Sequence, residues 1–428
     1  MSPLLKELEL IKNGAYDNAL SGLYGKVNLS KQKERYSRLV RTFYELYGSE
    51  RDIELFSAPG RTEVGGNHTD HNHGRVLAAG INLDAVAAAS KNDNGIINIK
   101  SENYNMDTVS LTELKVIPEE MGKSASLVRG VCAGFLKWGY KVGGFDAATV
   151  SDVLSGSGLS SSAAFEVLVG TIINHLYNNG KVSPVEIAMI SQYAENEYFG
   201  KPCGLMDQMA CSVGGFVAID FKNPSEPNIK KVNYDFSSSG YCLCIVNTGG
   251  SHSDLTDEYA NVRHEMESVA GFFNKTVLRD VEYSKVIENI PQIRAKVGDR
   301  ALLRAIHFYE DNERVQKQVK ALEDNNFEAF KKLVNESGYS SYMYNQNVFA
   351  CSNPQIQPVS LALAISENIL KDFGAWRVHG GGFAGTIQAF MPEYMLAEYK
   401  QKMEFIFGES SCYVLSIRPV GGVKIEIR

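Results

Sequence analysis

The sequence lacks the features by which nucleic-acid-binding, membrane-spanning and secreted proteins are usually recognised. It has no basic run, and its 43 Lys and Arg residues are outnumbered by 50 Asp and Glu residues, for a formal charge of −7. This balance gives neither a nucleic acid nor an anionic membrane an electrostatic reason to bind. No apolar run reaches about 18 residues, so no transmembrane helix is expected. The N-terminus, MSPLLKELELIK, has no cationic start before an apolar block, so no secretory signal is expected.

Cysteine is scarce and irregularly placed. The seven cysteines are an odd number, and none shows the C-x-x-C spacing of a zinc or redox motif. Disulfides and a zinc site are therefore not favoured, and reduced, buried thiols in a cytoplasmic protein are predicted.

Helical and extended patterns alternate along the 428 residues, without strict βαβ regularity, which favours a mixed α+β protein. Leu4, Leu5, Leu8 and Ile11 recur at helical spacing, and helices are predicted through residue 50. Residues 223–240, rich in Asn, Ser, Pro and Lys, are the predicted domain boundary. The predicted parts are a helical extension (1–50), an N-terminal domain (51–235) and a C-terminal domain (236–428).

A glycine- and serine-rich loop, GSGLSSSAA at residues 156–164, leads into a long apolar helix. Glycines let a ligand approach the backbone closely, and a helix N-terminus favours an anion. Three serines add hydroxyls, which suit a magnesium ion beside a phosphate. A flexible linker is the alternative, but Leu159 and the immediate helix favour a phosphate site. The Walker A and protein-kinase motifs are absent, so another phosphoryl-transfer architecture is required.

Two further glycine-rich stretches accompany this loop. PGRTEVGGNHTDH (residues 59–71) precedes it, and HGGGFAGT (residues 379–386) lies near the C-terminus. In this order the three stretches resemble those of the GHMP kinase superfamily. The first looks like the galactokinase signature, whose usual form is G-R-x-N-x-I-G-E-H-x-D-Y-x-x-G, and CGLMDQ (residues 203–208) is similar to the galactokinase catalytic segment. The resemblance runs from about Phe56 to the C-terminus.

This resemblance implies an α+β, two-domain GHMP kinase fold. Its N-terminal domain would be ribosomal-protein-S5-like and its C-terminal domain a ferredoxin-like α/β domain, with the active-site cleft between them. The implied activity is ATP-dependent phosphorylation of the anomeric C1 hydroxyl of a galactose-type sugar, with ATP and Mg²⁺ as cofactors. A monomer or weak dimer is expected, with small-molecule sugar and ATP as its partners.

The resemblance also assigns roles to individual residues. Asp207 matches the aspartate beside the anomeric hydroxyl, and Arg61 matches the arginine next to it. An aspartate accepts or orients the hydroxyl proton, while an arginine stabilises the charge on the transferring phosphoryl group. Ser162 matches the serine that ligates Mg²⁺, and Glu195 the carboxylate that completes the metal site; for Glu195 a solvent-facing helix position is the alternative. The implied ATP-binding residues are Gly156, Ser157, Gly158, Leu159, Ser160, Ser161 and Ser162.

The implied sugar-binding residues include one departure from the family pattern. His68, Asp70, Gly204 and Tyr259 match sugar-contacting positions, but Asn67 stands where galactokinases carry the Glu that bonds the C6 hydroxyl. An amide there costs that hydroxyl a charge-assisted hydrogen bond, about 1.5–3 kcal/mol. A C6 carboxylate, in contrast, would no longer be repelled by a negatively charged Glu at this position. His71 also departs from the pattern, because it replaces the usual Tyr. Galacturonate is therefore the alternative to galactose as substrate.

A further alternative belongs to another class of protein. Some galactokinase relatives are non-catalytic sugar-sensing regulators, and loss of the Ser-Ala pair in the serine loop is one route to that state. This chain keeps Ser162-Ala163 and Asp207, so an enzyme is predicted.

Overall fold

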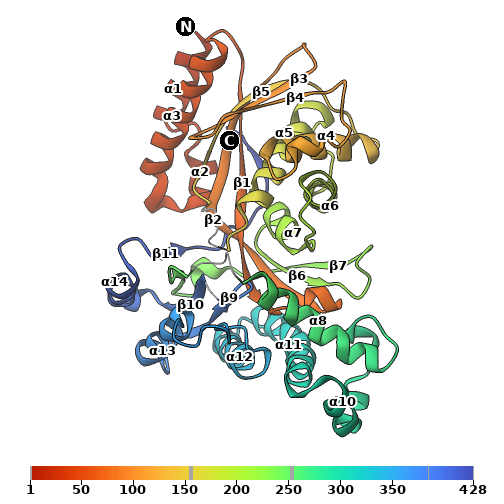
Figure 1. Ribbon diagram of the computed structural model, residues 1–428. Helices are drawn as coiled ribbons and strands as arrows, with labels where there is room; N and C mark the ends of the chain where they lie inside the picture. Colours follow the sequence, from red (N-terminus) through yellow and green to blue (C-terminus); the bar gives the residue numbers. More distant parts are fainter. Residues whose placement is uncertain (1, 154–157, 251–254, 384, 428) are drawn as a thin grey trace.

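Two β-sheets covered by helices form the framework of the molecule (Figure 1). The computed structural model describes residues 2–153, 158–250, 255–383 and 385–427. The larger sheet has the order β12-β1-β2-β5-β3-β4, and β6 pairs with both β2 and β7. Its strands are β1 (Glu54–Gly65), β2 (Arg75–Lys91), β3 (Ile96–Ser101), β4 (Met106–Ser110), β5 (Phe145–Ser151), β6 (Phe216–Asp220), β7 (Asn228–Val232) and β12 (Val423–Ile425).

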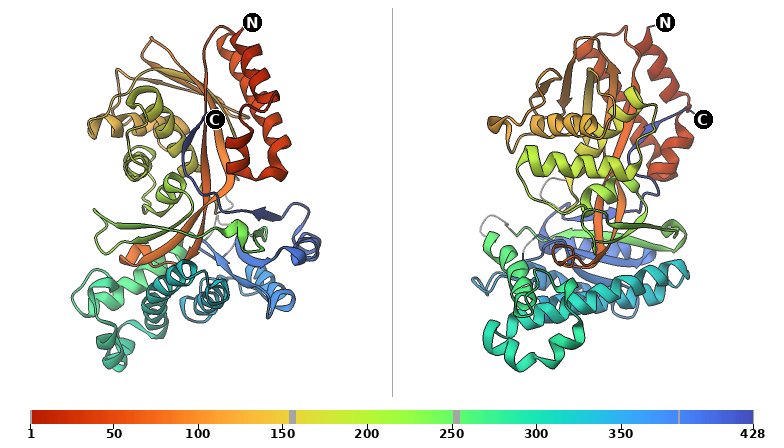
Figure 2. Two further views of the ribbon diagram at one scale, coloured as in Figure 1. Left: turned by 180° about the vertical axis from the view of Figure 1, so that it is seen from behind. Right: turned by 90° about the vertical axis from the view of Figure 1, so that its right-hand side faces the viewer.

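Helices lie on both faces of this sheet (Figures 1 and 2). The predicted N-terminal helices are present as α1 (Pro3–Lys12), α2 (Asp17–Tyr24) and α3 (Leu29–Tyr47) on one face. The other face carries α4 (Ser124–Lys137), α5 (Ser161–Asn178), α6 (Pro184–Tyr193) and α7 (Met206–Val213). Because strand side chains alternate, Val86 and Ala88 of β2 pack with the N-terminal helices, while Ala87 and Ala89 pack in the core on the α5 side.

The smaller sheet is antiparallel, with the order β11-β8-β10-β9. Its strands are β8 (Tyr241–Asn247), β9 (Ala375–His379), β10 (Thr386–Pro392) and β11 (Cys412–Leu415). The helices of this half are α8 (Thr256–Phe272), α9 (Tyr283–Glu288), α10 (Ile290–Val297), α11 (Asp299–Glu323), α12 (Phe327–Ser340), α13 (Pro358–Leu370) and α14 (Leu396–Phe407). All seven cysteines are free.

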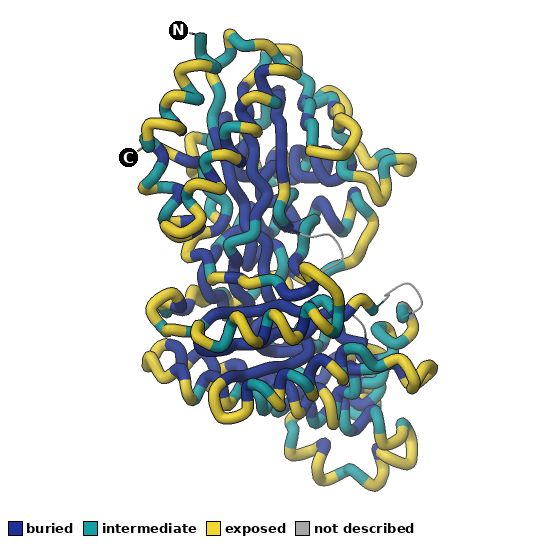
Figure 3. The backbone as a smooth tube through the Cα atoms, turned by 90° about the vertical axis from the view of Figure 1, so that its left-hand side faces the viewer, coloured by how far each residue is buried: buried dark blue, intermediate teal, exposed yellow. Residues whose placement is uncertain are grey.

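The two halves share strands and a buried interior, which runs without interruption from one to the other (Figure 3). The far ends of β1 and β2 reach the second half, where Gln388 of β10 donates to Thr62 Oγ1 at 2.7 Å. In return, β12 at the end of the chain pairs antiparallel with β1. Strand β1 is therefore held at one end by β12 and at the other by β10.

A buried carboxylate ties the N-terminal helices and the C-terminal segment to the sheet. Asp84 in β2 is fully buried and pairs with Arg35 of α3 at 2.7 Å and with Arg418 at 2.9 Å. The Tyr24 hydroxyl donates to the same carboxylate at 2.5 Å. Three segments distant in sequence thus meet at one charge, and the helical extension is part of the folded core.

No helix in the described part of the chain is both long and apolar enough to cross a membrane.

Candidate active site

A bidentate ion pair joins Arg61 of β1 to Asp207 of α7. Arg61 Nε donates to Asp207 Oδ1 at 2.7 Å, and Nη2 donates to Oδ2 at 2.8 Å. A β-bulge between Pro59 and Arg61 interrupts the pairing with β2 at this point, and bulges re-aim side chains. The Arg61 side chain is 9% exposed and that of Asp207 31%. The arginine is therefore a buried support, and the carboxylate is the group that a ligand reaches.

The surroundings keep Asp207 ionised. Burial raises the pKa of this carboxyl, but the Arg61 guanidinium and a hydrogen bond from the Ser160 hydroxyl outweigh burial and hold the pKa below its usual value. Asp207 also lies in the first turn of α7, where the helix dipole favours a negative charge. At neutral pH the site presents a carboxylate that accepts hydrogen bonds.

The serine loop lies against this ion pair. Arg61 Nη1 donates to the carbonyl of Gly158, and the Arg61 backbone N–H donates to that of Leu159 at 3.1 Å. Leu159 is fully buried, so its side chain packs in the core and only its backbone is available to a ligand. Gly158 and Ser160 both have left-handed φ, +73° and +58°, and α5 begins directly afterwards at Ser161. The predicted Gly156 and Ser157 lie outside the described residues.

Ser162 and Glu195 come together on the far side of the loop. Ser162 Oγ donates to Glu195 Oε1 at 3.1 Å. Glu195 is 2% exposed, so it does not face solvent. It lies in a π-helical turn, η4 (Ala194–Phe199), that continues α6, a distortion common at functional sites. Gln208 donates to its Oε2 at 2.6 Å, and Lys201 Nζ lies 3.2 Å from Oε1.

The predicted sugar-binding residues gather around the glycines of residues 380–382 and around Gly204. His68 Nε2 lies 2.8 Å from the Gly381 carbonyl, and the Tyr259 hydroxyl donates to Gly382 at 2.9 Å. A Cβ added to Gly204 would lie 3.1 Å from Asp70 Oδ2, so this glycine lies beside that carboxylate. Segments from both halves of the chain therefore meet here, and the Asp70 carboxylate lies close enough to Asp207 for their charges to interact.

Asn67 differs from expectation. Its side chain is fully buried, and all of its polar atoms have partners in the protein. Nδ2 donates to Glu63 Oε1 at 3.0 Å and to the Gly380 carbonyl at 2.8 Å. Oδ1 accepts from Ser341 at 3.1 Å and from Asn347 at 2.8 Å. The amide is saturated by protein groups, so in this structure it does not present a free donor to a sugar C6 group.

The reason lies in a second departure, at position 63. The galactokinase signature has Asn at this position and Glu four residues later, whereas this chain has Glu63 and Asn67. This segment therefore still carries a carboxylate, but at position 63 instead of position 67, and Arg377 pairs with it at 2.6 Å. His71 adds no charge: burial, followed by the nearby positive groups, lowers its pKa well below the usual value.

Three supporting residues were not identified from the sequence. Gln208 bridges Glu195 to Glu166, whose Oε2 lies 3.2 Å from Gln208 Nε2. Burial and the nearby Glu195 carboxylate raise the pKa of Glu166 well above its usual value. Lys201 is the ion-pair partner of Glu195. Glu166 lies one helical turn after Ser162, a spacing that could have indicated a shared face.

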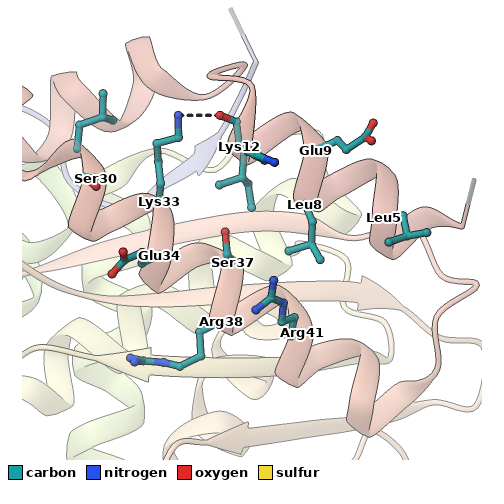
Figure 4. A pocket seen from close by; sticks show the side chains of 12 residues that line it. Leu5, Leu8, Glu9, Lys12, Ser30, Lys33, Glu34, Ser37, Arg38 and Arg41 are labelled. Carbon is teal, nitrogen blue, oxygen red and sulfur yellow. Dashed lines mark hydrogen bonds between the residues drawn. The ribbon is translucent and has the colours of Figure 1, made fainter.

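A groove of about 700 Å³ lies between α1 and α3 but contains none of these residues (Figure 4). Basic, acidic and apolar side chains line this groove. They include Leu5, Leu8, Lys33, Glu34, Arg38 and Arg41. Among the described residues, none of the site residues predicted from the sequence lines this groove.

Comparisons with known proteins agree with the geometry. The family model for the GHMP kinases N terminal domain matches residues 126–215, and that for the galactokinase galactose-binding signature matches residues 41–91. Galactokinase of Streptomyces coelicolor is 33% identical over 347 residues, covering 80% of this chain and 86% of the relative. Galactokinase of Glaesserella parasuis is 33% identical over 370 residues, covering 83% and 89%.

Solved structures share the fold. The crystal structure of Lactococcus lactis galactokinase complexed with galactose is similar with a TM-score of 0.75 at 23% identity, covering 90% of this chain and 98% of that one. Mevalonate kinase of Methanococcus jannaschii has a TM-score of 0.61 at 16% identity, covering 85% and 98%. The predicted α+β GHMP kinase fold is confirmed.

Proposed function

The chain belongs to the galactokinase family of GHMP kinases, and we propose that it transfers the γ-phosphoryl group of ATP to the anomeric C1 hydroxyl of galactose. The observation that carries the proposal is the Arg61–Asp207 pair. It lies between the serine loop, which suits an anionic phosphate chain, and the polar residues His68, Asp70 and Tyr259, which suit a sugar. ATP, the phosphoryl donor, on one side and the sugar, the phosphoryl acceptor, on the other would meet at Asp207.

Asp207 in this proposal orients the anomeric hydroxyl for in-line attack. The sugar oxygen forms the new bond to the γ-phosphorus while the bond to the β-phosphate oxygen breaks. In a loose phosphoryl-transfer transition state the hydroxyl needs little activation early. A carboxylate with a depressed pKa is a weak base, so Asp207 takes the proton late. Arg61 holds the carboxylate in place and stabilises the negative charge that develops beside it.

A magnesium ion fits Ser162 and Glu195. One hydroxyl and one carboxylate oxygen 3.1 Å apart are oxygen ligands of the kind Mg²⁺ takes, with substrate phosphates and water completing the set. No three His, Cys, Asp or Glu side chains form a metal cluster in the described ranges, so the protein alone offers too few ligands for tight binding. When bound, such an ion neutralises phosphate charge. Gly158, Ser160 and Ser161 would contact the phosphates.

We propose galactose rather than galacturonate. The uronate alternative depended on an amide at position 67 facing C6, and that amide is saturated by Glu63, Gly380, Ser341 and Asn347. It also depended on added positive charge, and His71 is neutral at pH 7 because burial lowers its pKa. The regulator alternative gains no support, since Ser162 and Asp207 both have the partners that catalysis requires.

The division of the chain at residues 50 and 235 remains part of the proposal. It is supported by the second sheet, which begins at Tyr241, and it is qualified by β12, which returns to the first sheet. The free state of the cysteines supports the cytoplasm as the place of action, and a monomer or weak dimer is retained.

The test is a comparison of ADP release on adding galactose, galacturonate, glucose or N-acetylgalactosamine, with the phosphorylated carbon identified by NMR. The proposal requires galactose to have the highest kcat/KM and C1 to carry the phosphate. No turnover with any sugar would reject the kinase assignment. A higher kcat/KM for galacturonate would reject only the choice of substrate. The Asp207→Ala variant provides the inactive control.

A further inference from the structure

Lys201 and Ser162 contact the same oxygen of Glu195. Lys201 Nζ lies 3.2 Å from Oε1, and Ser162 Oγ lies 3.1 Å from that atom. The other oxygen, Oε2, accepts from Gln208 at 2.6 Å and from the Cys203 thiol at 3.3 Å. Oε1 is therefore the side of the carboxylate at which a cation and the serine hydroxyl meet.

The ammonium reaches this oxygen from solvent. The Lys201 side chain is 63% exposed, whereas that of Glu195 is 3% exposed. The π-helical turn brings the two residues together, since the Lys201 N–H donates to the Glu195 carbonyl at 3.2 Å. A buried carboxylate without a counter-ion is unfavourable. Lys201 supplies one positive charge, on a flexible stem that can withdraw.

We propose that Lys201 is the resident counter-ion of the Ser162–Glu195 site and that a divalent ion must displace it. This inference rests on the proposed function, because it takes Ser162 and Glu195 as the metal ligands. Two cations on one carboxylate oxygen repel each other, so the ammonium competes with the metal. Lys201 is a positioning residue: it holds the Glu195 carboxylate in place before MgATP arrives, and it lowers the affinity of the empty enzyme for free metal.

The test measures Mn²⁺ binding to nucleotide-free enzyme by electron paramagnetic resonance. Lys201→Met should bind Mn²⁺ about threefold to tenfold more tightly than wild type, which corresponds to about 0.7–1.4 kcal/mol. Glu195→Gln should bind Mn²⁺ more weakly, and Lys201→Met should have no effect in that background. Lys320→Met removes a lysine of an exposed ion pair in α11 and should leave Mn²⁺ affinity unchanged.

A second readout uses thermal unfolding with EDTA or with Mg²⁺. Removing the resident cation should lower Tm in EDTA and enlarge the rise in Tm on adding Mg²⁺, and Lys201→Gln should behave as Lys201→Met does. If Glu195→Gln leaves Mn²⁺ affinity unchanged, the proposed metal site itself is rejected. If Glu195→Gln weakens binding while both Lys201 variants bind as wild type does, only the competition is rejected.

Discussion

Asn67 Nδ2 donates a 3.0 Å hydrogen bond to Oε1 of Glu63, and both side chains are buried. The galactokinase signature has the two residue types in the opposite order. The carboxylate and the amide have exchanged places along β1 and the turn after it, and Arg377 pairs with the carboxylate where it now lies. The pair, and not either residue alone, is therefore the unit that a substitution changes.

The first prediction concerns this exchange. Asn67→Glu places a second carboxylate against Glu63 in a buried site, so the free energy of unfolding should fall by about 3–5 kcal/mol. Adding Glu63→Asn removes the repulsion, so a double-mutant cycle should give a coupling energy of about 1–3 kcal/mol in favour of the double variant. Urea unfolding measures both quantities. Additive effects of the two changes would contradict the prediction.

The second prediction concerns catalysis. Asp207→Asn keeps the shape of the side chain but removes its charge, so the hydroxyl keeps only a neutral amide oxygen as acceptor and loses the carboxylate that would take its proton. We expect kcat to fall by about 100-fold to 10,000-fold, and the melting temperature to fall as well, because the buried Arg61 loses its counter-ion. Steady-state kinetics on galactose checks this. A loss of less than tenfold in a well-folded variant would remove Asp207 from the catalytic step.

The third prediction concerns pH. Burial raises the pKa of Asp207, and Arg61 with Ser160 lowers it further than burial raises it. The ionised form therefore persists to low pH, and its loss sets an acid limb of kcat/KM below the ordinary aspartate range. In Arg61→Met the counter-charge is gone, the pKa of Asp207 rises, and the acid limb should move to higher pH. An unmoved limb would show that another group sets it.

The fourth prediction concerns the serine loop. Gly158 has φ of +73°, and an added Cβ would lie 3.3 Å from His379 Nδ1. Gly158→Ala should cost about 1 kcal/mol in backbone strain and raise KM for ATP several-fold without a similar change in KM for galactose. Gly95→Ala is the matched control, because Gly95 has φ of +69° with no atom near its Cβ position. It should share the strain but not the change in KM.

The fifth prediction concerns stability. Asp84→Asn leaves the buried Arg35 and Arg418 without their shared counter-ion, so the free energy of unfolding should fall by about 3–5 kcal/mol. Burial raises the pKa of Asp84, but the two arginines hold it below the usual value. Its contribution is therefore present above the unfolded pKa and is lost as pH falls through the folded pKa.

The control for the fifth prediction is the exposed Lys320–Asp324 pair. Asp324→Asn should cost about 0.3–0.5 kcal/mol. When the pH is lowered below about 4, the free energy of unfolding should fall further in the wild-type protein than in Asp84→Asn. Urea unfolding at each pH measures both. Equal losses in the two proteins would show that Asp84 does not carry this pH dependence.

The main features of the fold could be predicted from the sequence, whereas several details of the site and of the strand pairing could not. The N-terminal helices follow from the spacing of Leu4, Leu8 and Ile11, and the GHMP kinase fold follows from three glycine-rich stretches in order. A π-helical turn at Glu195 was not predicted, because the local pattern is that of an ordinary helix. The return of β12 to β1 was not predicted either, since strand pairing over such a separation leaves no local signal.

The sequence by itself determined the family, because three glycine-rich stretches and the CGLMDQ segment occur in the order typical of galactokinases. It also singled out Arg61, Asp207, Ser162 and Glu195. Only the tertiary structure decided what Asn67 does. Its partners come from four separate segments, and a buried amide bonds whatever polar groups the fold brings to it. For the same reason Lys201 became informative only when the fold placed its ammonium and the Ser162 hydroxyl on one oxygen of Glu195.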